Sequence, residues 1–320
     1  MSAPVLVALL AIVTGCGSGQ PDAKDDARPV PALTSTPTAA PDGDGELVPE
    51  GLTDDLPPLE PTTGQSQDAG SKPPGRPAPT GRILGADVSW PQCPKGMGIP
   101  EKPTQGSPMP TAAAKFVILG LTNGPSFTPN PCLTDQLRWV KDRHLLGAAY
   151  AVHSTPDTAT LRKYGDRGPF RGSTRLGALS NAGYSAAGYN VASMRAARLF
   201  TPIVWIDVEP VPRFDWGSDT AANAAVIAGA ARGYTDAGYT VGYYSTPALW
   251  RRVVGTLRTG APEWRAAGQT SMAEALSRCG PDWSFQGGEA VFGQWVEDGR
   301  DRNVTCPGAS TDLGQYFYQY

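Results

Sequence analysis

The 320-residue sequence has only two histidines, no long run of basic residues, and no aromatic residue before Trp90. So little histidine leaves no basis for a His-rich metal site, and the missing basic run argues against binding of duplex nucleic acid. We therefore expect no metal, no cofactor and no nucleic-acid partner. Because aromatic side chains supply much of a hydrophobic core, a folded domain is expected only in the aromatic-containing part, from Trp90 to Tyr320.

The segment before this part is rich in proline and acidic residues. Residues 17–80 contain 13 prolines and 11 acidic residues against 4 basic ones. Such a stretch cannot bury enough apolar area to offset the entropy lost on ordering, and its composition favours an extended, semi-stiff spacer. The sequence therefore predicts a disordered tether over residues 16–81, followed by one folded domain over residues 82–320.

The amino end contains an apolar run, from Val5 to Val13, that ends at the sequence Val13-Thr14-Gly15-Cys16. The run is too short for a bilayer span, which needs about 20 residues, but it suits a signal peptide. Its ending resembles a bacterial lipobox, in which the cysteine becomes acylated. No Lys or Arg precedes the run, although signal peptides usually begin with basic residues. We predict a lipoprotein signal peptide over residues 1–15 and a membrane anchor at Cys16, outside the cytoplasm; the alternative is an ordinary buried or frayed cysteine.

Four cysteines remain when Cys16 is set aside: Cys93, Cys132, Cys279 and Cys306. An even number is typical of disulfides in an oxidising compartment, and four cysteines allow three pairings. We favour Cys93 with Cys132 and Cys279 with Cys306, because each pair is nearest in sequence and lies in loop-like surroundings. A zinc site is the alternative, but no C-x₂-C pair occurs and neither histidine lies near a cysteine.

Short apolar runs alternate with helix-like segments from Gly81 onward. The expected strands are 83–90, 116–121, 147–153, 202–208 and 240–245, and the clearest helices are 134–143, 179–200 and 218–237. After Gly260 the pattern changes: strands are expected at 261–267 and 290–296, with only a short helix between them. The fold class predicted is α/β, a modified TIM-type (β/α) barrel with a strand-rich carboxyl-terminal third.

The fourth expected strand ends in two acids, Asp207 and Glu209. Because side chains in a strand alternate, the two carboxylates share one face, and barrel enzymes place their active sites at the carboxyl ends of the strands. Like charges and apolar surroundings raise the pKa of one acid, as glycoside hydrolysis requires. The alternative is a capped helix start or an ion pair with Arg213. Asp87 occupies the corresponding position near the end of the first strand, where the alternative is a turn.

Several motifs together resemble glycoside hydrolase family 25, the lysozyme-type muramidases, and in particular the related domains of secreted actinobacterial proteins. They are Gly85-Ala86-Asp87-Val88-Ser89 with Gln92, Gly147-Ala148-Ala149-Tyr150, Trp205-Ile206-Asp207-Val208-Glu209, Gly242-Tyr243-Tyr244-Ser245 with Trp250, and Gly293-Gln294-Trp295 followed by Thr311-Asp312-Leu313. They occur in family order and span nearly all of residues 82–320.

The resemblance implies a barrel of five βα units with extra strands, and cleavage of β-1,4 bonds in peptidoglycan. It implies Glu209 as general acid, with Asp207, Asp87 and Asp312 stabilising charge in the transition state. Whether a carboxylate or the substrate's own acetamido group acts as nucleophile stays open. The substrate-binding residues we expect are Tyr150, Trp205, Tyr243, Tyr244, Gln294 and Trp295, since aromatic faces stack on sugar rings.

Residues 153–176 form an insertion with Arg162, Arg167, Arg171 and Arg175. It either binds acidic wall polymer, covers the cleft, or is simply a solvated charged face. Our hypothesis is a monomeric, exported lipoprotein that hydrolyses cell-wall polysaccharide. The alternatives are a non-catalytic glycan-binding or wall-remodelling domain that keeps the barrel, and a glycosidase for another envelope polysaccharide.

Overall fold

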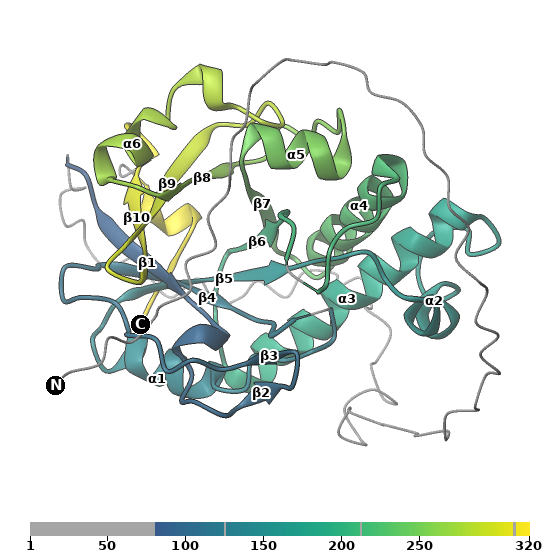
Figure 1. The fold of residues 1–320 in the computed structure, drawn as a ribbon, viewed down its shortest axis with the longest axis horizontal. Coiled ribbons are helices and arrows are strands. Elements are labelled where there is room, and N and C mark those ends of the chain that lie inside the picture. Colours follow the sequence, from purple (N-terminus) through teal and green to yellow (C-terminus); the bar gives the residue numbers. More distant parts are fainter. Residues whose placement is uncertain (1–80, 125, 212, 310–311) are drawn as a thin grey trace, which may run out of the picture. The chain divides into compact units, whose positions relative to one another are not determined.

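The computed structural model describes residues 81–124, 126–211, 213–309 and 312–320. Its main sheet has nine strands in the order β11-β5-β4-β1-β10-β9-β8-β7-β6, and a further pairing of β5 with β6 closes the ring. The predicted α/β barrel is therefore confirmed (Figure 1). The predicted signal peptide and Cys16 lie outside the described residues, as does the tether up to residue 80.

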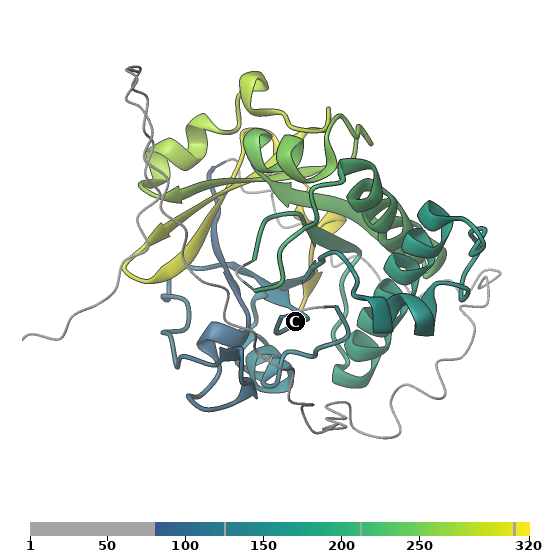
Figure 2. The ribbon, with the colours of Figure 1, turned by 45° about the vertical axis from the view of Figure 1, so that its right-hand side comes forward.

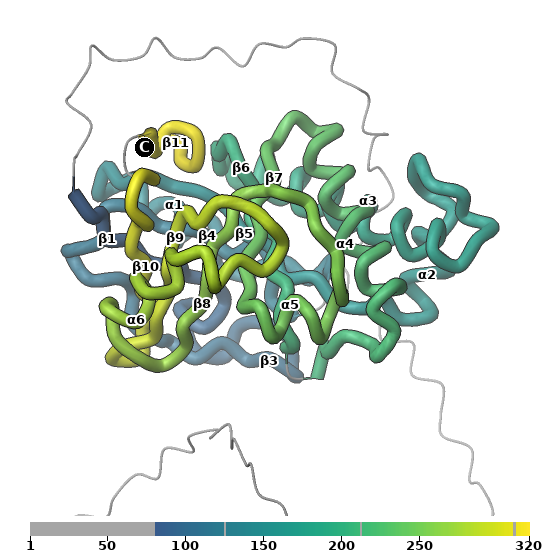
Figure 3. The backbone as a smooth tube through the Cα atoms, turned by 90° about the horizontal axis from the view of Figure 1, so that it is seen from above, coloured from purple at the N-terminus to yellow at the C-terminus, as the bar shows by residue number. Residues whose placement is uncertain are grey.

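Two kinds of strand pairing make up the barrel. The strands β1 (Leu84–Val88), β4 (Phe116–Gly120), β5 (Leu146–Val152), β6 (Ile203–Asp207), β7 (Thr240–Ser245), β8 (Glu263–Gln269) and β9 (Ala290–Glu297) run parallel. The strand β10 (Arg300–Thr305) lies antiparallel between β9 and β1 (Figure 3). A short strand, β11 (Tyr318–Gln319), pairs with the start of β5. The predicted strand-rich end is confirmed, although the sequence did not indicate β10.

Helices cover the outside of the barrel. They are α1 (Leu133–Lys141), α2 (Thr158–Tyr164), α3 (Arg175–Ala197), α4 (Thr220–Asp236), α5 (Pro247–Val254) and α6 (Met272–Ser277). The helix α4 begins where Asp219 accepts hydrogen bonds from the amides of Ala221 and Ala222, and it ends before Gly238, which has a φ of +90°. The sequence predicted α1, α3 and α4, whereas α2 lies within the supposed insertion and α5 was missed.

The helices α3 and α4 pack closely side by side (Figure 2). A Cβ atom at Gly229 would lie 1.9 Å from the carbonyl oxygen of Ser180, and one at Gly183 would lie 2.0 Å from that of Val226. The contact therefore requires glycine on both helices. It holds α3 against α4, which in turn contacts β6 and β7, and the two predicted acids lie at the end of β6.

The core is divided by the barrel wall. Inside the barrel, Phe116, Trp205, Trp264 and Phe292 pack against one another, together with Phe317 at the end where the parallel strands begin. A second, larger cluster lies between the outer face of the strands and the helices, as two-residue alternation requires. The interior is filled with aromatic rings up to the level at which polar side chains begin, near the carboxyl ends of the parallel strands.

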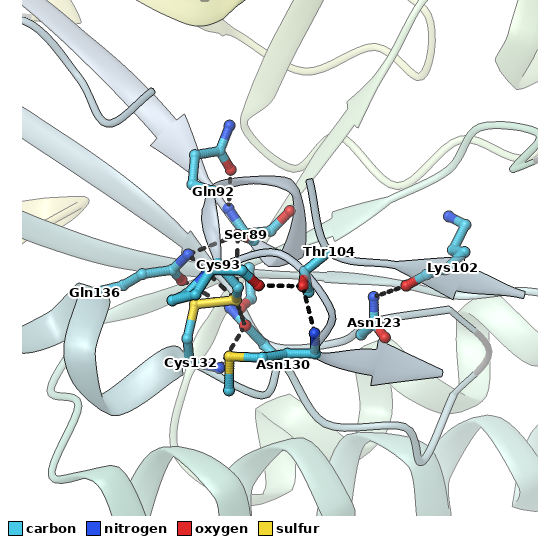
Figure 4. The surroundings of a disulfide bond; sticks show 12 residues. Ser89, Gln92, Cys93, Lys102, Thr104, Asn123, Asn130, Cys132 and Gln136 are labelled. Carbon is cyan, nitrogen blue, oxygen red and sulfur yellow. Dashed lines mark hydrogen bonds between the residues drawn. A yellow bond between two sulfur atoms is a disulfide. The ribbon is translucent and has the colours of Figure 1, made fainter. Parts of the chain in front are cut away.

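Both predicted disulfides are confirmed: Cys93 pairs with Cys132 and Cys279 with Cys306. The first joins the loop after β1 to the start of α1 (Figure 4). That loop continues into a small hairpin of β2 (Gly98–Ile99) and β3 (Lys102–Pro103). The side chain of Asn123 accepts a hydrogen bond from the amide of Ile99 and donates one to the carbonyl of Lys102. The hairpin is thus tied to the barrel beside its mouth.

Within the described part of the chain, no helix is both long enough and apolar enough to cross a membrane.

Candidate active site

Four acidic side chains interact at the carboxyl ends of the parallel strands. Asp87 lies near the end of β1, Asp207 is the last residue of β6, and Glu209 follows two residues later. The fourth is Asp301, near the start of β10. The pairing of Ala86 with Arg302 brings Asp301 beside Asp87, because β10 runs in the opposite direction to β1. The structure therefore unites Asp87, Asp207 and Glu209, as the strand ends predicted, and adds Asp301.

Burial and mutual repulsion make these carboxyl groups hold protons. Burial raises the pKa of Glu209 to about 7, with a further contribution from the charge of Asp301. Burial likewise raises the pKa of Asp301 to about 6. The pKa of Asp207 is raised well above its usual value by burial and then by the charges of Glu209 and Asp87. At neutral pH a large fraction of Glu209 is thus protonated, and Asp301, with its lower pKa, is mostly ionised.

Asp87 is held by two amide side chains. Asn303 donates a 2.7 Å hydrogen bond to Oδ1 of Asp87, and Gln294 donates a longer one of 3.3 Å to the same oxygen. Both bonds lower the pKa of Asp87, but burial and the charge of Asp301 outweigh them, so that it is raised well above its usual value. The hydroxyl of Tyr244 in turn donates to Oε1 of Gln294 at 2.9 Å. The orientation of the Asp87 carboxylate is fixed by this network.

Asp207 has a different environment. Its side chain is buried, with 4% of its surface exposed, and its Oδ1 atom has no hydrogen-bond partner among the described residues. A buried carboxylate oxygen without a partner is costly when charged. Asp207 is therefore suited to carry a proton, or to face positive charge supplied by a ligand. Neither Asp207 nor Glu209 pairs with Arg213, which is exposed.

One cation faces the acids. Lys102, on β3, lowers the pKa of both Asp207 and Glu209, and partial burial lowers its own pKa. Its Nζ atom lies 5.0 Å from the centre of the Trp90 ring. Both residues line a groove of about 500 Å³ that also includes Lys95, Glu101 and Arg213. The groove gives a ligand access beside the acids and an indole ring to contact.

Three of the predicted substrate-binding residues reach the site. Tyr244 and Gln294 belong to the Asp87 network. Tyr150 lies close by, since burial and then the charge of Asp87 raise the pKa of its hydroxyl well above the usual range. Tyr244 belongs to β7, Gln294 to β9 and Tyr150 to β5. All three side chains lie on the inner face of the barrel, near the level of Asp87.

The other three do not reach it, which corrects the prediction. Tyr243 and Trp295 are on the outer face of their strands: Tyr243 packs against Trp250 of α5, and Trp295 lies in a cluster with Ala275 of α6. Trp205 points inward but is fully buried below the acids, against Trp264 and other rings. Strand alternation puts neighbours on opposite faces, so Tyr243 and Tyr244 cannot both face the site.

Asp312 is also placed elsewhere. It is exposed and accepts a hydrogen bond from the side chain of Gln315. It comes just before β11, which pairs with the beginning of β5, whereas the other acids lie at the carboxyl end of the parallel strands. The structure thus contradicts the prediction of Asp312 as a fourth site acid, and Asp301 occupies that place.

Asp301, Asn303 and Lys102 were missed by the sequence reasoning. The alternation of Asp301, Asn303 and Thr305 on one face of β10 is a weak signal that the sequence does contain. For Lys102 there is no comparable signal, because it comes from a short hairpin that is far in sequence from Asp207 and Glu209, the acids it faces. In the described ranges, no group of three or more His, Cys, Asp or Glu side chains is arranged to hold a metal ion.

The fold and site define an α/β barrel with a cluster of acids at the carboxyl end of its strands. No family model matches this chain, and no curated protein matches it either. Solved structures that do match include the modular autolysin LytC from Streptococcus pneumoniae in complex with a synthetic peptidoglycan ligand, at 12% identity and a TM-score of 0.42. That match covers 70% of this chain and 46% of LytC, so the chain matches about half the length of LytC.

Two other matching structures are more equal in length. A bacterial lysozyme from Streptomyces coelicolor is 13% identical with a TM-score of 0.45, and the match covers 73% of this chain and 97% of the lysozyme. A family 25 glycosyl hydrolase from Bacillus anthracis is 14% identical with a TM-score of 0.44, and the match covers 74% of this chain and 94% of the hydrolase.

Proposed function

We propose that this protein is a glycoside hydrolase that cleaves β-1,4 bonds of peptidoglycan or a related cell-envelope glycan. The observation that carries the proposal is the meeting of Glu209 with Asp87, Asp207 and Asp301 at the barrel mouth. Binding alone does not require several buried carboxyl groups to repel one another, whereas glycoside hydrolysis requires a protonated acid next to ionised carboxylates. The family resemblance of the motifs supports the choice of substrate.

Glu209 is the general acid. Its pKa of about 7 keeps a large fraction protonated near neutral pH, so that it can donate a proton to the oxygen of the leaving sugar. Asp87, held by Asn303 and Gln294, faces the positive charge that develops on the sugar ring as the bond breaks. Asp207 and Asp301 contribute negative charge to the same cluster when they are ionised. Trp90 and Tyr150 contact the sugar rings through their flat faces.

The test is glycan release from peptidoglycan by the full-length protein, read by mass spectrometry of new reducing ends. Glu209→Gln should lower the rate by about 10²- to 10⁴-fold, the usual contribution of a general acid, while the melting temperature does not fall. Asp301→Asn should also lower it, whereas Asp312→Asn should not, because Asp312 lies outside the cluster. Retained binding without any product would favour the non-catalytic glycan-binding domain instead.

We also propose that the protein is an exported lipoprotein, anchored at Cys16 and extended from the membrane by residues 16–81. The two disulfides support an oxidising compartment. Metabolic labelling with a palmitate analogue should label the protein, and Cys16→Ser should abolish the label and release the protein from the membrane fraction. Labelling that persists in Cys16→Ser would contradict the anchor.

A further inference from the structure

A second cavity, of about 300 Å³, lies next to the groove that contains Lys102 and Trp90. Arg213 lines both, so the two hollows are contiguous. The cavity's walls come from the loops that follow β4, β5 and β6, which leave the barrel at the same end as the acids. Its volume is at the lower end of the range for small-ligand sites, about 300 to 1,000 Å³.

The floor of this cavity is made of small apolar groups. It consists of Ala182, Gly183 and Ala186 from α3 with Val226 from α4. Such a floor fits methyl groups. Two aromatic side chains, Phe127 and Phe214, also line the cavity, but Phe127 already stacks face to face on Tyr164 at 4.3 Å, so that its face is not free for a sugar ring.

The wall contains a polar group that lacks a partner. Ser154 is buried, with 7% of its surface exposed, and its hydroxyl makes no hydrogen bond to another described residue. The Oγ atom of Ser154 keeps some exposed surface, so it is open to a ligand in the cavity. A donor or acceptor supplied by a ligand would satisfy Ser154.

The rim carries charges of both signs. Arg213 is exposed and forms no ion pair or hydrogen bond with the described residues. Asp157 and Asp215 lie at the same rim, but Asp157 accepts a hydrogen bond from the amide of Thr160 and Asp215 is paired with Arg252 at 3.9 Å. In glycan that carries its peptides the muramic acid carboxyl is an amide, so the sugars have no charge to match Arg213, whereas a peptide with a free carboxylate has one.

Two bulky residues of the cavity have an unusual backbone. Phe127 and Arg213 have φ values of 73° and 72°, in the left-handed region that such side chains seldom adopt. Strained residues of this kind persist only when the surrounding structure enforces them, and they are concentrated at ligand-binding sites. Arg213, with this backbone conformation, lines both the groove and the cavity.

We propose that this cavity binds the peptide branch of the wall polymer while the glycan lies in the adjoining groove. Small side chains of the peptide contact the apolar floor, its carboxylate pairs with Arg213, and Ser154 hydrogen-bonds to its backbone. This inference rests on the proposed function for the identity of the polymer. It adds a specificity: glycan that carries its peptides is a better substrate than glycan stripped of them.

Binding of a peptide that a glycosidase cannot cleave tests the cavity independently of catalysis. The probe is the synthetic tetrapeptide L-Ala-γ-D-Glu-L-Lys-D-Ala, titrated by calorimetry into the full-length protein. Arg213→Glu should weaken binding by about tenfold through charge repulsion, and Thr160→Trp should weaken it because Thr160 lines the cavity and the larger side chain fills it. Arg171→Glu is the matched control, since Arg171 is an exposed arginine outside both the cavity and the groove, and it should bind normally. Thermal melts confirm that each variant is folded.

Hydrolysis gives a second readout. Thr160→Trp fills the cavity and does not line the groove, so it should raise KM for peptide-bearing glycan and leave both constants unchanged for glycan stripped of its peptides by an amidase. If the wild-type protein fails to bind the tetrapeptide, or if all variants bind it equally, the inference is wrong even when glycan is hydrolysed. If the tetrapeptide binds in a cavity-dependent way but no glycan is cleaved, the cavity assignment stands and the proposed hydrolase activity fails.

Discussion

The indole N–H of Trp264 donates a 2.7 Å hydrogen bond to the side-chain oxygen of Asn303. An indole can only donate, so this bond fixes which end of the Asn303 amide is the oxygen. The NH₂ group must then point at Asp87, to which it donates at 2.7 Å. A tryptophan in the interior of the barrel thus determines the environment of an acid at its mouth.

Replacing Asn303 by leucine should affect the ionisation of Asp87. The bond from Asn303 lowers the pKa of Asp87, so its loss raises that pKa and Asp87 takes up a proton at higher pH. The acidic limb of the pH–rate profile should move to higher pH, and the rate at pH 6 should fall by about tenfold or more. Asn190→Leu is the control, because it also removes a buried amide, but one that lies between α3 and α4. The idea is refuted if both variants give the same pH profile.

Replacing Lys102 by methionine should affect the basic limb of the pH–rate profile. The charge of Lys102 lowers the pKa of Glu209, so without it that pKa rises above about 7 and Glu209 keeps its proton at higher pH. The basic limb should therefore shift upward, and the shift should diminish in 1 M salt, where the screening length is about 3 Å. Lys95→Met, in the same groove, is the control. An unchanged basic limb in Lys102→Met would show that Lys102 does not act on the acid.

The two disulfides should differ in their effect on activity. Each closes a loop of comparable length, with sequence separations of 39 and 27, so replacing either pair by serines should lower the free energy of unfolding by a similar amount, about 3 to 4 kcal/mol. Only the pair Cys93 and Cys132 anchors the loop that leads to Lys102 (Figure 4). Its loss should lower activity as well, measured on folded protein at low temperature. Equal activity in the two variants would contradict this role of the loop.

The Glu209→Gln variant should be more stable than the wild type at alkaline pH. The folded-state pKa of Glu209, about 7, is raised above the unfolded value of about 4.5, so the folded protein prefers the protonated form. Wild-type stability conferred by this group is present below pH 4.5 and is lost as pH rises through 7. Glutamine is neutral throughout, so we expect a gain on the order of 2 kcal/mol at pH 8 and little difference near pH 4.

Chemical denaturation at the two pH values measures this difference. Glu289→Gln serves as the control, since Glu289 lies outside the acid cluster. A stability difference between Glu209→Gln and the wild type that does not change with pH would exclude a raised pKa at Glu209.

The sequence by itself determined the barrel class, the two disulfide pairs and three of the acids. These depend on local information: apolar runs set the parallel strands, two-residue alternation set the face shared by Asp207 and Glu209, and nearest cysteines paired. Asp87 could be placed because the carboxyl ends of parallel strands meet at one mouth, whichever strands they are.

Only the tertiary structure decided which other residues surround the acids. The strand β10 is antiparallel and polar at its start, so its direction and register, which bring Asp301 and Asn303 to Asp87, follow from pairing with both neighbours. Lys102 reaches the site through a hairpin held by a disulfide and by Asn123. Asp312 was misplaced because a motif match gives the order of residues along the chain, and does not say at which end of the barrel a residue lies. The pKa values of the acids also depend on the tertiary structure, because burial and the charges of residues distant in sequence determine them.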